Sequence, residues 1–188
     1  MPTFAHDLRY LTAGSELLEQ FLLSKDVYWP IGIKAHAGEA PYPQLSLGSL
    51  LLSERRCTAR ARTDRERAEL AETSEIILHN QHSWRVAWEN KAALEFRARL
   101  KQWSLYVDDL RQDPPDNYDR YSYEVFRRVI IELLAVYVRD PSPSDLELQN
   151  SLDALVKNLL VNGEFIWEAE LEKAFPPSPF WYLYRDIR

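Results

Sequence analysis

The amino-acid sequence predicts an all-α protein, an irregular helical bundle of about six helices with one long central helix and little or no sheet. The stretch 64–112 contains neither proline nor glycine, and the whole chain has only five glycines. This scarcity argues against doubly wound nucleotide-binding sheets, which depend on glycine turns. Apolar side chains also recur at steps of three, four and seven, which keeps one side of a helix apolar. They are Leu70, Ile77, Trp84, Trp88, Ala92, Phe96, Leu100, Trp103, Val107 and Leu110.

The stretch 64–112 is unusually long for one helix. A continuous helix over these residues would reach roughly 70 Å at 1.5 Å per residue, more than a domain of this size usually needs. The sequence therefore predicts either a break or a protruding arm. Residues Asn80–Ser83 have the weakest helix propensity, so a kink is expected there. The alternatives of one rod and of two helices packed back on each other stay open.

Two helices and an extended connection are predicted before this stretch. Residues 4–24 have helical spacing, with a break expected at Gly14, where Ser15 would cap a second segment. Residues 27–33 are aromatic and β-branched but contain proline, which suits an extended buried segment, and 34–43 is a loop. Residues 45–62 then form a helix, with Ser46 as its N-cap.

Shorter helices are predicted after this stretch. Residues 121–138 have a broad apolar face, and Ser144 with Glu147 fits a capping box that opens a helix to about residue 161. Asn162-Gly163 is expected to cap that helix, and the alternative is a hairpin turn. Residues 164–175 form a further short helix, and 176–184 an extended tail rich in aromatic residues and proline.

The chain is expected to form a single helical domain over 1–188. Pro114 and Pro115 stop a helix and mark a candidate subdomain break near 113–119. Because the apolar faces on both sides of this break are incomplete, we expect the two sides to pack together.

Charge and composition narrow the classes of partner. The net charge of −6 argues against nucleic acid as the main partner. A single cysteine, Cys57, gives no internal disulfide and suits a reducing compartment. The first residues lack the pattern of a secretory signal, and the longest uncharged run, Ala40–Ser53, is too short to span a bilayer. We therefore expect a cytoplasmic protein without membrane insertion.

Carboxylates and imidazoles on one helical face form a candidate metal site. Glu72, Glu75, His79 and His82 follow one another at steps of three, four and three, and the last three are the predicted ligands. Metal sites in helical bundles take ligands from facing helices, and the Glu-x-x-His motif of such sites is absent from this sequence. The alternative is a solvated polar face.

Arginines form the second candidate site. Arg55, Arg56, Arg60 and Arg62 are the predicted anion- or nucleic-acid-binding residues of a basic cluster that extends to Arg67. Acidic residues are interleaved at helical spacing, which is typical of a solvated helix face with internal ion pairs. Cys57 lies within this segment without an orienting histidine or aspartate in the sequence nearby, so we interpret it as a bystander.

The aromatic tail is the third candidate site. Tryptophan and tyrosine are frequent anchors of protein interfaces, and chain ends stay loose unless something holds them. Phe180, Trp181, Tyr182 and Tyr184 are therefore predicted to bind a partner. The tail could instead pack on its own domain or on a second copy. For the other aromatic strip, Tyr28–Ile31, we favour packing against the core.

These observations favour a non-enzymatic adaptor or assembly subunit that binds a protein partner or self-associates. The sequence contains neither a phosphate-binding glycine-rich loop nor a Gly-x-Ser-x-Gly nucleophile motif, and no cofactor is expected. The first alternative is a metal- or small-ligand-dependent helical enzyme that uses Glu75, His79 and His82. The second is a nucleic-acid accessory protein that uses the arginines of 55–67.

Overall fold

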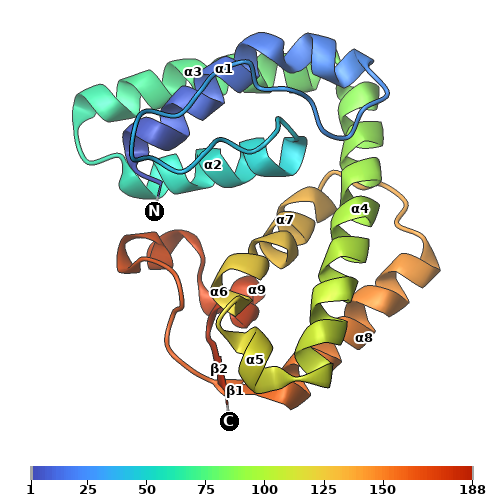
Figure 1. Cartoon of the computed structure of the whole chain (residues 1–188). Helices are drawn as coiled ribbons and strands as arrows, with labels where there is room; N and C mark the ends of the chain where they lie inside the picture. Colours follow the sequence, from blue (N-terminus) through green and yellow to red (C-terminus); the bar gives the residue numbers. More distant parts are fainter. Residues whose placement is uncertain (1, 188) are drawn as a thin grey trace. The chain divides into compact units, whose positions relative to one another are not determined.

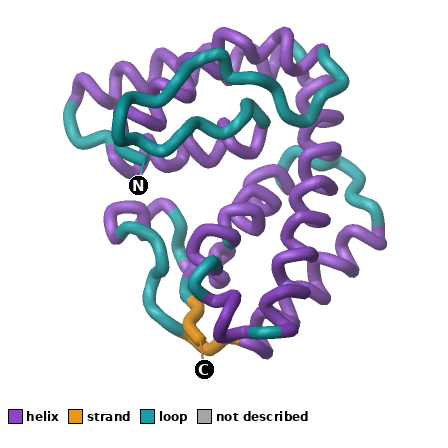
Figure 2. The backbone as a smooth tube through the Cα atoms, viewed as in Figure 1, coloured by secondary structure: helices purple, strands orange, loops and turns teal. Residues whose placement is uncertain are grey.

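The computed structural model describes residues 2–187, which fold into helices and a single small antiparallel sheet (Figures 1 and 2). The prediction of an all-α fold is confirmed.

The described residues form two compact units, unit 1 up to Glu95 and unit 2 from Phe96 onward. This boundary lies within a helix, about seventeen residues before the 113–119 segment for which the sequence predicts a candidate break. The single-domain assignment stays a prediction. Within residues 2–187, no helix combines the length and apolar character needed to cross a membrane.

The stretch 64–112 forms two helices, α3 (Asp64–Ser83) and α4 (Arg85–Gln112). A capping box begins α3, in which Thr63 and Glu66 satisfy each other's backbone amides. The break comes at Trp84, whose φ of −115° and ψ of 36° leave the helical region, directly after the predicted kink. At 1.5 Å per residue, α4 is about 42 Å long. Most of the predicted apolar stripe is buried, including Trp88, Phe96 and Trp103.

Unit 1 contains α1 (Phe4–Leu23), α2 (Leu47–Arg60), α3 and the first part of α4. The predicted break at Gly14 is wrong, because α1 is continuous across it. Gly14 is instead the point of close approach between α1 and the start of α2: a Cβ there would lie 2.8 Å from Leu50 Cδ1 and 3.1 Å from Leu45 Cδ1. The Ser15 hydroxyl donates to the Thr12 carbonyl within the same helix and caps nothing. Ser46 caps α2, as predicted.

Two buried charges on α4 hold the ends of α1 and α2. The Lys91 ammonium donates to the carbonyls of Ser24 at 2.9 Å and Asp26 at 2.7 Å, just past the C-terminus of α1. One turn later, the Glu95 carboxylate accepts from the Ser46 hydroxyl at 2.7 Å and the Gly48 amide at 2.8 Å, at the N-terminus of α2. A cation therefore faces the negative end of one helix dipole and an anion faces the positive end of another.

Before its C-terminal segment, unit 2 contains the rest of α4 and four further helices, namely α5 (Pro114–Tyr118), α6 (Tyr121–Glu124), α7 (Phe126–Ala135) and α8 (Pro143–Leu159). The helix predicted over 121–138 is thus divided at Val125. The cap of α8 is Ser142 and not the predicted Ser144, because proline at 143 takes the first helical position. The buried Arg128 of α7 makes a two-pronged ion pair with Asp153 of α8, at 2.9 Å for each contact.

The C-terminal segment contains two short strands and three helical turns. Strand β1 (Leu160–Asn162) pairs with β2 (Arg185–Ile187) in antiparallel register, Leu160 opposite Ile187. Between them come a 3₁₀ turn at Ala169–Ala174, α9 (Pro177–Phe180) and a second 3₁₀ turn at Trp181–Leu183. The predictions of an Asn162-Gly163 cap and an extended tail over 176–184 are therefore wrong. The short helix expected over 164–175 is reduced to the 3₁₀ turn.

Replacing Gly163 by alanine should destabilise unit 2. An added Cβ would lie 2.7 Å from Asp186 Cβ and 3.1 Å from the Asp186 amide nitrogen, so β2 would have to move. We expect the free energy of unfolding to fall by about 1–3 kcal/mol, as for other overpacked sites. Urea unfolding would measure this loss, with the exposed Asn150→Ala as control. Equal stability of the two variants would contradict the close approach of β2 to Gly163.

Candidate functional site

The predicted metal ligands lie on the solvent-facing side of α3. Glu72, Glu75, His79 and His82 are all exposed, and they share one helical side as their spacing predicts. Among residues 2–187, no group of three histidine, cysteine, aspartate or glutamate side chains is placed to hold a metal ion. The structure thus brings the four side chains to one side of a helix and adds no ligand from a second element.

The predicted basic cluster does not form one surface. Arg60 is buried and donates to Asp7 of α1 at 2.9 Å, while Arg55 and Arg56 are half-buried and Arg62 lies exposed beyond the end of α2. The following arginines pair along α3 with neighbouring acids, Arg65 with Glu69 at 2.8 Å and Arg67 with Asp64 at 2.6 Å. This arrangement favours the alternative of internal ion pairs over a phosphate-binding face.

A buried polar group joins α1, α2 and the loop between them. The Asp7 carboxyl accepts from Arg60, and burial raises its pKa above the ordinary value, although Arg56 and Arg60 offset part of that rise. Beside it, His6 Nε2 lies 2.9 Å from the carbonyl of Ala40, and its ring packs against Tyr42 at 4.4 Å. These contacts fix the loop and α2 onto α1.

Cys57 should be unreactive in the folded protein. Its side chain is fully buried, and burial together with the nearby Asp7 carboxylate raises the thiol pKa well above the ordinary value. We expect an aromatic disulfide reagent to label the single thiol only after the protein is unfolded. A matched control is Cys57→Ser combined with Thr58→Cys, which places the thiol at the adjacent, exposed position and should react at once. Equally fast labelling of the two proteins would contradict the burial.

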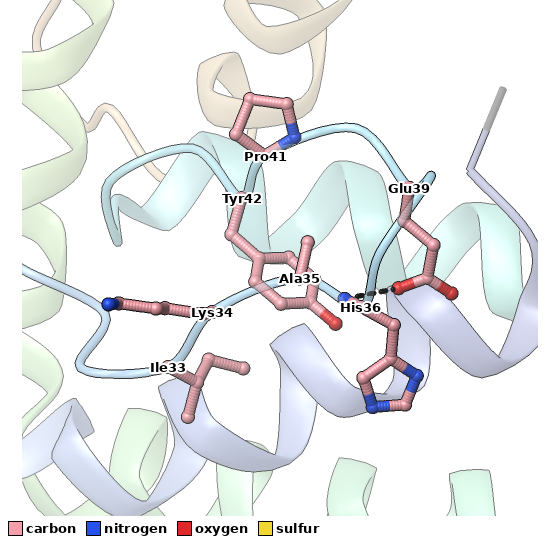
Figure 3. Close-up of a pocket in the computed structure, with 7 residues that line it drawn as sticks. All are labelled: Ile33, Lys34, Ala35, His36, Glu39, Pro41 and Tyr42. Atoms are coloured by element: carbon pink, nitrogen blue, oxygen red, sulfur yellow. Dashed lines mark hydrogen bonds between the residues drawn. The ribbon is translucent and has the colours of Figure 1, made fainter.

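A pocket of about 320 Å³ lies in the loop between α1 and α2, lined by Ile33, Lys34, Ala35, His36, Glu39, Pro41 and Tyr42 (Figure 3). Arg9 of α1 donates to both Glu39 oxygens, at 2.6 and 2.5 Å, and to the Tyr42 hydroxyl at 3.0 Å. The hydrogen bond from Arg9 lowers the Glu39 pKa. The Lys34 side chain points away from His36 and Glu39 in Figure 3. The carboxylate and the phenol are thus engaged in holding the loop on α1.

The aromatic tail packs on its own unit. Phe180 and Tyr182 are buried in unit 2, whereas Trp181 and Tyr184 are half-buried. The Tyr121 hydroxyl donates to the Tyr182 carbonyl at 2.7 Å, and the Tyr184 hydroxyl to the carbonyl of Phe175 at 2.9 Å. Two cations cover the Trp181 ring, with Lys157 Nζ at 4.5 Å and Arg185 Cζ at 4.9 Å from its centroid. The structure therefore leaves parts of Trp181 and Tyr184 as the accessible portion of the predicted partner site.

A different surface, which sequence reasoning missed, lies across α1 and α3. The two helices pack against each other in unit 1 and run in the same direction (Figure 1), with Thr12 Oγ1 3.5 Å from Thr73 Oγ1. Near these threonines and toward the C-terminal end of α1, each helix contributes two exposed carboxylates and one exposed aliphatic side chain to a common set. We call this set the α1–α3 surface: Glu16, Glu19 and Leu23 of α1, with Glu72, Glu75 and Ile76 of α3.

The carboxylates of the α1–α3 surface form no ion pair with any residue of 2–187. The reason is local, because none of the four has lysine or arginine three or four positions away on its helix. The two aliphatic side chains are large and accessible, with Leu23 56% and Ile76 44% exposed. The sequence indicates only the acids without a basic neighbour at helical spacing; the pairing of the two helices comes from the structure.

Comparison with known proteins found no relative of this chain: no family model, curated protein or solved structure matches it.

Proposed function

We propose that this chain is a non-enzymatic, protein-binding subunit of a larger assembly, and that it binds its partner through the α1–α3 surface. The observation that carries this proposal is the set of four carboxylates that have no ion pair within residues 2–187, together with two exposed aliphatic side chains on the same two adjacent helices. The complementary partner is a protein surface with lysine or arginine side chains around an apolar contact.

The aliphatic and the acidic side chains of the α1–α3 surface would contribute to partner binding in different ways. Burying Leu23 and Ile76 against a partner would contribute about 25 cal/mol for each Å² of apolar surface removed from water. Each exposed ion pair contributes at most about 1 kcal/mol, and salt screens it. The carboxylates would therefore mainly direct association and select a basic partner, while the aliphatic side chains hold the complex together.

The buried ionisable groups support a structural role rather than a catalytic one. Arg60 pairs with Asp7, Arg128 pairs with Asp153, and Glu95 binds the first turn of α2. Burial lowers the pKa of Lys91, and its ammonium is surrounded by the three oxygen acceptors that it contacts near the end of α1. These groups hold helices to one another.

Co-purification from the native host tests the proposal. The tagged chain is compared with Glu72→Lys/Glu75→Lys, which reverses two charges of the α1–α3 surface, and with Glu147→Lys/Glu164→Lys. The control residues are exposed acids of unit 2 that form no ion pair in residues 2–187. We expect one protein in stoichiometric amount with the chain and with the control, and a clear reduction or complete loss of it with the reversed surface.

Circular dichroism would verify that all three proteins are equally folded. Equal recovery of the partner with the reversed surface would assign binding elsewhere, and absence of any stoichiometric protein would contradict the proposed function.

A further inference from the structure

We infer that the partner of the α1–α3 surface is a second copy of this chain, which binds it through the exposed side of α4 in unit 2. This inference rests on the proposed function and names the partner. It is motivated by charge complementarity, because this part of α4 presents two cations and one large aliphatic side chain, Arg97, Lys101 and Leu105.

The three side chains share one side of α4. They follow one another at steps of four, so successive members lie one turn apart. Arg97 and Lys101 are exposed, and Leu105 is 61% exposed. We call this set the α4 surface.

The cations of the α4 surface form no ion pair with any residue of 2–187. Their helical neighbours explain this, because the positions three and four residues from Arg97 and Lys101 contain no acid. Other arginines of the same helix are paired, Arg85 with Glu89 at 3.5 Å and Arg111 with Asp108 at 3.6 Å. The α4 surface is therefore a helix side whose charges lack a counterion within residues 2–187.

The two surfaces match in charge and in apolar content. Carboxylates on adjacent turns of α3 can face cations on adjacent turns of α4, while Ile76 and Leu105 supply the apolar contact. A contact between so few side chains is smaller than a standard stable interface. Self-association should therefore be weak, dependent on protein concentration and reduced by salt.

Sedimentation velocity of the full chain at low salt, over a range of concentrations, tests the inference. The proteins are the chain, Glu72→Lys/Glu75→Lys, Arg97→Glu/Lys101→Glu, and the control Glu147→Lys/Glu164→Lys. We expect the chain and the control to associate equally, and each surface reversal to weaken association about tenfold, the effect of losing two exposed pairs. An equimolar mixture of the two reversed proteins should associate again, because opposite charges then meet across two copies.

The outcomes separate this inference from the proposed function. A chain that stays monomeric at every concentration, or a mixture that fails to associate while both variants are folded, would overturn the second copy as partner. The co-purification experiment would still decide whether the α1–α3 surface binds a different protein.

Discussion

Replacing Glu95 by alanine is expected to lower the free energy of unfolding by about 3–5 kcal/mol. This is the range for truncating a buried side chain when the hydrogen bonds that it makes are lost as well. The carboxylate is fully buried and accepts from the Ser46 hydroxyl and the Gly48 amide. Without it, these donors lose their acceptor, the first turn of α2 loses its anion, and a void is left between α2 and α4. Urea unfolding followed by circular dichroism would measure the loss.

Two further variants make the Glu95 result specific. Glu95→Gln keeps the shape and one oxygen acceptor, so its loss should be smaller than that of the alanine variant. Asn90→Ala truncates an exposed side chain of the same helix and should change stability by less than about 0.5 kcal/mol. A loss for Glu95→Ala no larger than that for Asn90→Ala would contradict the role of Glu95.

Replacing Arg60 by methionine is expected to cost up to about 3–5 kcal/mol at neutral pH, because it removes the hydrogen-bonded partner of the buried Asp7 carboxylate and leaves Arg56 as the guanidinium that offsets its burial. The intact pair need not stabilise the fold by itself, since both charges lose their hydration on burial. The double variant Asp7→Asn/Arg60→Met also removes the buried carboxylate charge and should therefore recover part of the stability. No recovery would show that the loss comes from packing of the arginine and not from an uncompensated charge.

The Arg60→Met variant should also change how stability depends on pH. Burial raises the folded-state pKa of Asp7 above its unfolded value, so the folded state holds this proton more tightly. The Asp7 contribution is consequently present at low pH and lost as pH rises through the folded-state pKa. Removing Arg60 raises that pKa further, so the stability deficit of the variant should shrink as pH falls from neutral. A pH-independent deficit would contradict an ionised Asp7 as its cause.

Most helix positions were predictable because their signals are local. The cap at Ser46, the absence of proline and glycine from 64–112, and the weak propensity before Trp84 all act within a few residues. The apolar stripe likewise fixes which side of α4 is buried, since helical spacing alone decides it.

The failed predictions involve contacts between residues distant in sequence. Gly14 was interpreted as a helix break, but its lack of a Cβ serves the approach of Leu50 from α2. Asn162-Gly163 was interpreted as a cap, but Asn162 pairs with Arg185 of β2. A short stretch of sequence does not show which distant segment it will pair with.

The candidate sites were predicted less well for the same reason. Helical spacing correctly places Glu75, His79 and His82 on one side of α3, but it cannot show whether another element supplies ligands. The burial of Arg60, Phe180 and Tyr182 depends on tertiary packing. The α1–α3 surface could be identified only once α1 and α3 were known to lie side by side.

Site-specific photo-crosslinking in the native host would show directly whether a protein binds the α1–α3 surface. A photoreactive phenylalanine analogue is placed at Ile76, and in a control at Thr58, which is exposed on α2. We expect one dominant protein adduct from position 76, lost on addition of Glu72→Lys/Glu75→Lys, and no such adduct from position 58. Absence of an adduct at position 76, or the same adducts from both positions, would contradict such binding.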